Sequence, residues 1–329
     1  MEEAMFWSKE GKKIRCNLCA FNCLLEDGQF GRCKLRYNNK NSLKIKNYGN
    51  IKDTKVQSIE NIPMYHFFPG QDVFTVSTIG TNIDWIKKTT DKFDKIKKLK
   101  SEELVKTMNA KKIKLLAFND YEPTMSFELI FKILRLAKRY NIKTMLVTNG
   151  FMSSEAIKKI GKYLDAVNVK IIASADKEFY KKYLNVDDVS PIFDSLKNFK
   201  KHRVFIEVSN TIIPEIGEDE NSHSHLVDWI INNLDSSVPY HLMKFEPFGD
   251  FHEIPETPVE LFEKFSFDAE KNGLRFVYVH DPYVAGYSTT YCYNCRFPLI
   301  ERLGEAIVEN RLDKDRCPSC GFKINLVIE

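Results

Sequence analysis

The chain has 329 residues, of which 43 % are apolar and 29 % are charged, and its formal net charge is +4. This composition excludes an intrinsically disordered chain, because its hydrophobicity is high and its net charge is low. No apolar run approaches the about 20 residues of a membrane span, and Met1-Glu2-Glu3 does not begin a signal peptide, so we expect a cytoplasmic protein without membrane attachment.

Residues 1–70 form an irregular opening rich in cysteine and glycine, with short strands expected at 43–48 and 56–59. From residue 73 onward, apolar segments of strand length alternate with segments of helical periodicity. We expect strands at 73–79, 112–118, 144–148, 165–172, 204–213, 239–245 and 274–279. We expect helices at 127–140, 153–163, 177–183, 190–199, 221–233 and 258–272. This alternation predicts βα units around a parallel sheet, either a partial or complete α/β barrel or a doubly wound sheet.

Four cysteines near the C-terminus follow the pattern C-x2-C-x21-C-x2-C: Cys292, Cys295, Cys317 and Cys320. Four thiolates close the tetrahedral shell of Zn²⁺ and leave no open position, which is typical of a structural site. The metal would hold together a module too small to fold by itself. The sequence therefore predicts a zinc-ribbon-like module at residues 286–329.

Four more cysteines near the N-terminus follow the pattern C-x2-C-x3-C-x9-C: Cys16, Cys19, Cys23 and Cys33. Residues 34–291 contain no cysteine at all. The first interpretation of this set is a second structural zinc site. The alternatives are an iron–sulfur cluster, which three or four thiolates can also hold, and thiols without metal.

Several motifs together resemble a known family. Besides the two cysteine sets, the matching segments are Met64–Gly70, Glu122–Thr124, Val147–Gly150, Asp165–Asn168 and Glu301–Asn310. Over about its whole length the chain resembles the radical SAM protein of the AmmeMemoRadiSam system, which is similar to pyruvate formate-lyase activating enzymes. The resemblance implies a partial α/β barrel of the radical SAM type at residues 71–285, between a Cys-rich segment at 1–70 and the module at 286–329.

The resemblance also implies where the family's cofactors would lie. In the family, a C-x3-C-x2-C motif after the first barrel strand holds a [4Fe-4S] cluster that cleaves S-adenosylmethionine. The three ligand positions fall here on Thr81, Trp85 and Lys88, none of which supplies a thiolate. Glu122 and Asn149 match strand-end positions that help hold S-adenosylmethionine, although helix initiation and a turn are their alternative interpretations.

The segment after the first barrel strand is basic. Between Thr81 and Lys112, positive side chains outnumber negative ones by five. This Lys87–Lys112 region would attract RNA or another anion, or it is a solvated lysine-rich helix and linker.

These observations support three hypotheses. The first is a degenerate radical-SAM-fold protein, a pseudoenzyme that binds a protein partner as a scaffold or regulatory subunit and contains two structural metal sites. The second is an active radical SAM enzyme whose iron–sulfur cluster lies on the N-terminal cysteines. The third is a non-redox enzyme, or an anion- or RNA-binding protein, that uses Lys87, Lys88, Lys170 and Lys244 at the barrel mouth. We assign no catalytic residue; His280, next to Asp281, is considered only as a general base that would reach this mouth.

Overall fold

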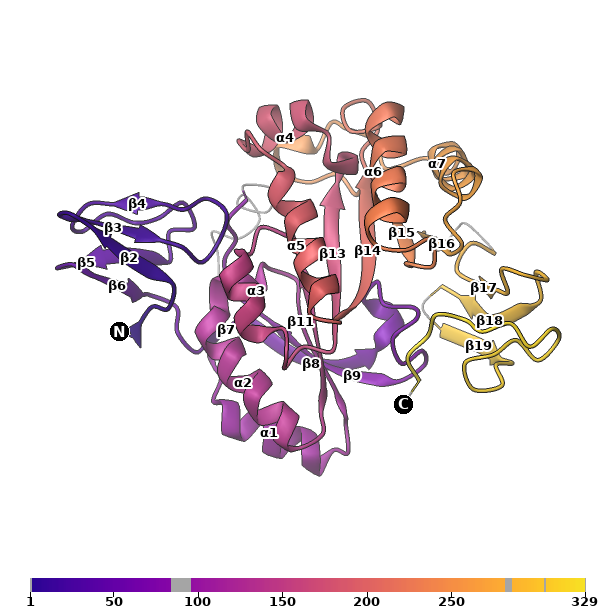
Figure 1. The fold of residues 1–329 in the computed structure, drawn as a ribbon, viewed down its shortest axis with the longest axis horizontal. Coiled ribbons are helices and arrows are strands. Elements are labelled where there is room, and N and C mark those ends of the chain that lie inside the picture. Colours follow the sequence, from indigo (N-terminus) through magenta and orange to yellow (C-terminus); the bar gives the residue numbers. More distant parts are fainter. Residues whose placement is uncertain (1, 84–95, 282–285, 305, 329) are drawn as a thin grey trace. The chain divides into compact units, whose positions relative to one another are not determined.

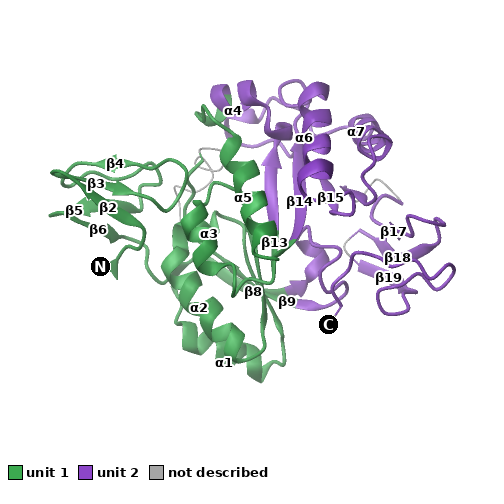
Figure 2. Cartoon of the chain, in the orientation of Figure 1, with its two compact units in different colours: residues 1–56, 73–167, 183–205 green, residues 57–72, 168–182, 206–329 purple. Residues whose placement is uncertain are grey.

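The computed structural model describes residues 2–83, 96–281, 286–304 and 306–328 (Figure 1). The chain divides into two compact units, each assembled from several segments (Figure 2). Unit 1 contains residues 1–56, 73–167 and 183–205, and unit 2 contains residues 57–72, 168–182 and 206–329.

Eight strands form the main sheet in the hydrogen-bonded order β16-β15-β14-β13-β12-β11-β9-β8. Their bounds are β8 (Asp53–Ser58), β9 (Asp72–Ser77), β11 (Leu115–Asn119), β12 (Lys143–Thr148), β13 (Ala166–Ile172), β14 (Phe205–Ile212), β15 (Tyr240–Lys244) and β16 (Val277–His280). The pairs β9/β11, β11/β12, β14/β15 and β15/β16 are parallel. A doubly wound sheet reverses its strand order at a switch point. This sheet follows chain order throughout, so the barrel-type alternative is the correct one.

Seven helices accompany the sheet in the described residues: α1 (Ser101–Ala110), α2 (Phe127–Arg139), α3 (Ser154–Ile160), α4 (Lys177–Leu184), α5 (Ser190–Lys201), α6 (Glu220–Asn233) and α7 (Val259–Lys271). All helices expected from periodicity are confirmed within three residues at each end. Local capping sets several of these ends, because Ser153 accepts from Ala156 N at α3 and Asp219 accepts from Ser222 N at α6.

The N-terminal part of unit 1 consists of short antiparallel strands. One sheet has the order β1 (Glu2–Glu3), β6 (Ser42–Ile45), β5 (Arg36–Asn39), and another has the order β2 (Trp7–Glu10), β3 (Lys13–Cys16), β4 (Leu24–Leu25). A third pairs β7 (Asn50–Ile51) with β10 (Lys97–Lys98). Such small sheets bury little apolar area, so they depend on packing against α2 and on polar contacts.

The C-terminal part of unit 2 is a three-stranded antiparallel sheet of β17 (Thr290–Tyr291), β18 (Pro298–Leu303) and β19 (Ala306–Asn310). Cys292 and Cys317 are buried in one apolar cluster with Leu299, Ile300 and Ile324. The same cluster includes Tyr65, Phe276 and Tyr278, so the module packs on the rest of unit 2. None of the described helices is long and apolar enough to cross a membrane.

Candidate functional site

The C-terminal cysteines converge on one point in unit 2. The sulfur atoms of Cys292, Cys295, Cys317 and Cys320 all lie within 4.8 Å of one another. The Cys292–Cys320 and Cys295–Cys317 sulfur separations are 3.6 Å and 3.7 Å. A tetrahedral site with Zn–S bonds of about 2.3 Å places its sulfurs about 3.8 Å apart. The four thiols are therefore spaced to hold a metal ion.

Two matching turns present these thiols. In each C-x-x-C segment the residue after the second cysteine donates its backbone N–H to the carbonyl of the first, Arg296 to Cys292 and Gly321 to Cys317, both at 2.8 Å. Arg296 and Gly321 share the left-handed backbone conformation, with φ of 61° and 72°. Gly321 meets this requirement without a steric penalty, and the other turn adopts it with an arginine.

The N-terminal cysteines lie in one region of unit 1 but form a looser group. Cys16 and Cys19 are buried, and Cys23 and Cys33 are half-buried. Burial raises the pKa of Cys19 to about 12, and the charges of the other three thiols act in the same direction. Among the described residues, only the C-terminal cysteines form a group of three or more ligand atoms within 4.8 Å of one another. A metal on the N-terminal set therefore remains a prediction.

The N-terminal cysteine segment packs on the loop that follows β9. Arg32 donates from Nε to the Asn82 carbonyl at 2.9 Å and from Nη2 to the Leu184 carbonyl at 2.8 Å. Leu35 lies so close to Gly80 that a Cβ there would be 2.3 Å from Leu35 Cδ1. Gly80 also has a positive φ of 91°, a conformation that favours glycine, and Leu35 would have to shift to admit any Cβ there.

Glu122, an expected cofactor ligand, has its carboxylate satisfied within unit 1. It caps the short helical turn Pro123–Ser126 and accepts hydrogen bonds from the Thr124 N–H (3.0 Å), the Thr148 hydroxyl (2.8 Å), the Asn149 N–H (2.8 Å) and the Thr124 hydroxyl. Burial raises the pKa of Glu122, and these four donors oppose that shift. The carboxylate serves as a helix cap, in line with its alternative interpretation.

Asn149, the second expected cofactor ligand, also bonds internally. Its Nδ2 donates to Asn82 Oδ1 at 2.7 Å, and its Oδ1 accepts from Phe151 N at 3.1 Å. Thr81 uses its hydroxyl within the same loop, donating to the Ile83 carbonyl at 2.9 Å. A role of Glu122 and Asn149 in holding S-adenosylmethionine stays a prediction.

The basic region is only partly visible, because residues 84–95, including Trp85, Lys87 and Lys88, lie outside the described residues. Of the described lysines, Lys97 pairs with Asp53, Lys98 donates to the Tyr48 carbonyl and Lys100 pairs with Glu103. In unit 2, Lys244 pairs with Glu256 at 2.7 Å and with Asp281 at 3.2 Å. Binding of an anion or RNA at Lys87–Lys112 remains a prediction.

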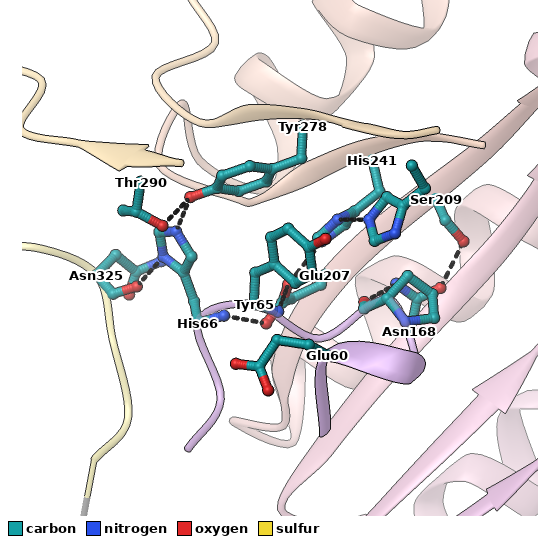
Figure 3. Close-up of polar contacts among 12 residues, drawn as sticks. Glu60, Tyr65, His66, Asn168, Glu207, Ser209, His241, Tyr278, Thr290 and Asn325 are labelled. Carbon is teal, nitrogen blue, oxygen red and sulfur yellow. Dashed lines mark hydrogen bonds and ion pairs between the residues drawn. The ribbon is translucent and has the colours of Figure 1, made fainter. Parts of the chain in front are cut away.

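A buried polar network occupies the interior of unit 2 (Figure 3). At its centre the Glu207 carboxylate accepts the backbone N–H groups of Tyr65 and His66, both at 2.9 Å, and binds His241 Nε2 at 2.7 Å. His241 Nδ1 lies 2.8 Å from His280 Nε2. Glu207 and His241 are fully buried, and His280 is half-buried.

Further polar groups extend this network toward the C-terminal module. His66 lies 2.6 Å from the Asn325 carbonyl through Nδ1 and 2.6 Å from the Tyr278 hydroxyl through Nε2. Arg302 donates to the Thr290 hydroxyl at 2.9 Å and to the Tyr65 carbonyl at 3.0 Å. The network thus connects the strand ends of unit 2 to its four-cysteine module.

Sequence reasoning singled out His280 but missed Glu207 and His241 as its partners. The available signal was a single carboxylate inside the apolar strand segment Val204–Ile213, because a buried charge requires hydrogen-bonding partners. Which groups those partners are depends on residues distant in sequence, such as Tyr65, and local patterns do not reveal them.

The network predicts a protein that loses stability in acid. Burial lowers the pKa of His66 to about 4, that of His241 to about 3 and that of His280 well below its usual range. These groups stabilise the fold above the unfolded-state pKa near 6.5, and their contribution is lost as the pH falls. Glu207 acts in the opposite direction, because burial raises its pKa to about 7. Its contribution to stability is present at low pH and is lost as the pH rises through about 7.

Between pH 6 and pH 5 the unfolded chain binds more protons than the folded one, because three histidines act in this direction and one carboxyl acts against it. We therefore expect the free energy of unfolding to fall by about 2 kcal/mol per pH unit. Urea titrations at stepped pH values measure this slope. His241→Phe should reduce the slope by the share of one proton, whereas replacing the exposed His225 by Gln should leave it unchanged. A flat profile in this range would contradict neutral burial of these rings.

The chain is similar to a family model and to several known proteins. Residues 81–230 match the family model of the radical SAM superfamily. An uncharacterised protein of Methanocaldococcus jannaschii, MJ0808, is 29 % identical over the full length of both chains. A radical SAM methyltransferase from Sphaerobacter thermophilus is similar in fold, with a TM-score of 0.50, 12 % identity and coverage of 65 % of this chain and 67 % of that one. A domain of a pyruvate-formate lyase-activating enzyme from Bacteroides vulgatus has a TM-score of 0.41 at 14 % identity, covering 50 % of this chain and 98 % of that one.

The family match begins at Thr81 and includes β11, β12 and β13. The strand order and the parallel pairs described above are those expected of a barrel-type α/β protein. Residues 81–230 are therefore similar to the radical SAM superfamily, and the chain has the radical SAM α/β fold.

Proposed function

We propose that this chain is a degenerate radical-SAM-fold protein that lacks the core [4Fe-4S] site. It acts by binding, as a scaffold or regulatory subunit with two structural metal sites. The observation that carries the proposal is the complete absence of cysteine from residues 81–230, the segment that matches the superfamily. Iron–sulfur clusters are held by thiolates, so the donor set of this segment does not fit the cluster.

The surroundings of the loop after β9 support the same proposal. The hydroxyl of Thr81, the one aligned ligand position among the described residues, bonds within the loop. Leu35 covers Gly80, and Arg32 is bound to the Asn82 carbonyl, so side chains of the N-terminal segment occupy this place. Glu122 and Asn149 likewise use their polar atoms within unit 1. These contacts hold the loop in place with groups of the chain itself.

We further propose that the partner is a protein and that the system is of the AmmeMemoRadiSam type. Exposed apolar side chains in the C-terminal module, Leu303 (75 % exposed) and Val308 (66 % exposed), suit a protein surface better than a nucleic acid. Both metal ions are proposed to be zinc, because four thiolates with no open position are typical of structural zinc sites.

Metal and acid-labile sulfide content, measured on protein purified without oxygen, tests this proposal. We expect about two zinc ions per chain, no iron, and no absorbance near 400 nm that dithionite bleaches, because closed thiolate sites hold redox-silent zinc. Iron with stoichiometric sulfide would overturn it, since the chain would then contain a cluster.

A second candidate function is favoured by the packing of Arg32 and Leu35 on the loop at residues 80–82, which brings the N-terminal cysteines to that end of unit 1. Here the N-terminal thiolates would hold the cluster of an active radical SAM enzyme. In this case reduced protein forms 5′-deoxyadenosine from S-adenosylmethionine, and Cys19→Ala abolishes both the product and the iron. Cys295→Ala is the matched control, because it removes a thiolate from the other set and should lower zinc alone. If wild-type protein forms no 5′-deoxyadenosine, this candidate is excluded.

A further inference from the structure

A chain of buried hydrogen bonds in unit 2 ends in a ring nitrogen that has no partner among the described residues. It runs from Glu207 through His241 to His280, with N···O and N···N distances of 2.7 Å and 2.8 Å. In the described part of the chain, His280 Nδ1 has no hydrogen-bond partner, and it is not among the buried unsatisfied atoms. Glu207 and His241 are wholly buried, whereas His280 is half-buried (Figure 3 shows the inner pair). Only the His280 end of this chain of hydrogen bonds is open.

The inner end decides which nitrogens carry protons. Both Glu207 oxygens already accept backbone N–H groups, Oε2 from Tyr65 and Oε1 from His66. When this carboxylate is ionised it accepts a third hydrogen bond, so His241 must donate from Nε2. Nδ1 of His241 then accepts a hydrogen bond from Nε2–H of His280. Nδ1 of His280 is consequently left with its lone pair.

Aromatic rings hold this arrangement in place. The Tyr278 ring stacks on His241, with centroids 5.3 Å apart and an interplanar angle of 27°. The Tyr65 ring lies 5.2 Å from His241 and 4.7 Å from His280. Because both imidazoles contact aromatic rings, packing restrains their rotation and so preserves this chain of hydrogen bonds.

The position of His280 suits a binding site. It ends β16, and its register partner is Met243 in β15. Binding groups in α/β folds collect at the carboxyl ends of parallel strands. A network that only stabilised the core would be satisfied at both ends, whereas this one leaves its strand-end nitrogen open.

We propose that Glu207, His241 and His280 form a proton-transfer site, in which His280 Nδ1 takes the proton of a hydroxyl or thiol group on a small ligand. The proton balance is complete within these three side chains. As Nδ1 gains the ligand's proton, the Nε2 proton of His280 passes to His241 Nδ1, and the Nε2 proton of His241 passes to the Glu207 carboxylate. His280 is the group that touches the ligand, and Glu207 and His241 position it.

Protonation of Glu207 reverses every donor and acceptor in the chain, and Nδ1 of His280 then carries a hydrogen. Burial raises the pKa of Glu207 to about 7, so this reversal falls near neutral pH. The other titratable or charged groups around the chain are His66, Tyr65, Tyr278, Arg302, Glu60 and Lys170. Burial lowers the pKa of His66 to about 4, so this neighbouring ring stays neutral near pH 7.

Diethyl pyrocarbonate is the probe for the open nitrogen. An unprotonated imidazole nitrogen attacks its carbonyl carbon, forms an N–C bond and releases ethanol and carbon dioxide, and mass spectrometry assigns the modified histidine. We expect modification of His280 to increase as the pH rises through about 7, because ionised Glu207 frees Nδ1. The exposed His225 is the internal reference, because its ring is open to solvent and lies outside this chain of hydrogen bonds.

The decisive variant is Glu207→Gln, which keeps the size of the side chain and removes its titration. We expect the His280 rate at pH 8 to fall by about tenfold or more and its pH dependence to flatten, while His225 is unaffected. Glu256→Gln is the matched control, because that carboxylate pairs with Lys244 outside the chain of hydrogen bonds. An unmodified His280 in wild-type protein, or an unchanged profile in Glu207→Gln, would overturn the proposal.

A second measurement needs no variant. Nitrogen-15 spectra of the wild-type rings at pH 8 should show His280 and His241 as neutral Nε2–H tautomers. The Nδ1–H tautomer of His280 at this pH would refute the assignment. These tests do not depend on metal content, so their outcome is separate from that of the proposed pseudoenzyme function.

Discussion

Cys317→Ser should release one metal ion and unfold the C-terminal module. The Cys317 thiol is buried and contributes one of four converging sulfurs, and three remaining ligands cannot close a structural site. Structural zinc contributes about 10–16 kcal/mol in small modules, far more than a sheet of three short strands gains from its own packing. We therefore expect rapid proteolysis after residue 286 and a loss of one zinc per chain.

The matched control is Ser319→Ala, which changes the same turn without touching a ligand atom. Zinc content and limited proteolysis, measured in parallel on both variants, separate loss of the metal from general damage to the turn. Loss of the module should also disturb the interior of unit 2, because Arg302 donates to the Tyr65 carbonyl. If Cys317→Ser retained its zinc and its protease resistance, the structural role of this metal would be wrong.

The site also predicts how metal binding responds to pH. Burial raises the pKa of Cys292 to about 12, whereas hydrogen bonds, first that of Asn294, lower the pKa of Cys320 to about 6. Without metal, Cys320 is therefore ionised near neutral pH and Cys292 is a thiol. Metal binding must displace the Cys292 proton, so zinc affinity rises with pH.

Glu128→Ala should cause the second large loss, in the N-terminal part of unit 1. Arg36 Nη2 binds both Glu128 oxygens at 2.5 Å and 2.7 Å, and the two side chains are only 1 % and 8 % exposed. Removing one partner of such a pair leaves a buried charge and costs about 3–5 kcal/mol. Because Met5 also bonds to Glu128, the first strands should detach from α2.

Two further variants make this prediction specific. Arg36→Met combined with Glu128→Leu removes both charges, so the free energy of unfolding should recover most of the loss seen with Glu128→Ala. Glu26→Gln breaks the exposed pair with Lys13 in the same segment and should cost less than about 1 kcal/mol. Chemical denaturation monitored by tryptophan fluorescence measures the stability of all three variants. Equal losses in the single and double variants would show that the buried charge is not the cause.

Sequence patterns by themselves predicted most helices and strands of the α/β part and the C-terminal cysteine set, but not α1 or most of the short N-terminal strands. Helical periodicity and capping residues such as Ser153 and Asp219 act over a few positions, so the bounds of α3 and α6 could be predicted locally. Each C-x-x-C pair specifies its own turn. The tertiary structure is needed only to bring the two pairs together. The absence of cysteine from residues 34–291 is also a fact of sequence, and it decides which ligands the segment that matches the superfamily model can supply.

The tertiary structure alone decided how distant side chains combine. Leu35 covers Gly80, Arg36 pairs with Glu128, and Glu207 receives the backbone of Tyr65 and His66. These contacts join residues 45 to 142 positions apart, and a buried charge is satisfied by whatever donors the fold brings to it. Local periodicity carries no information on such pairings, because it reports only which face of an element is buried. The open nitrogen of His280 follows from them and emerges only when the strands are assembled.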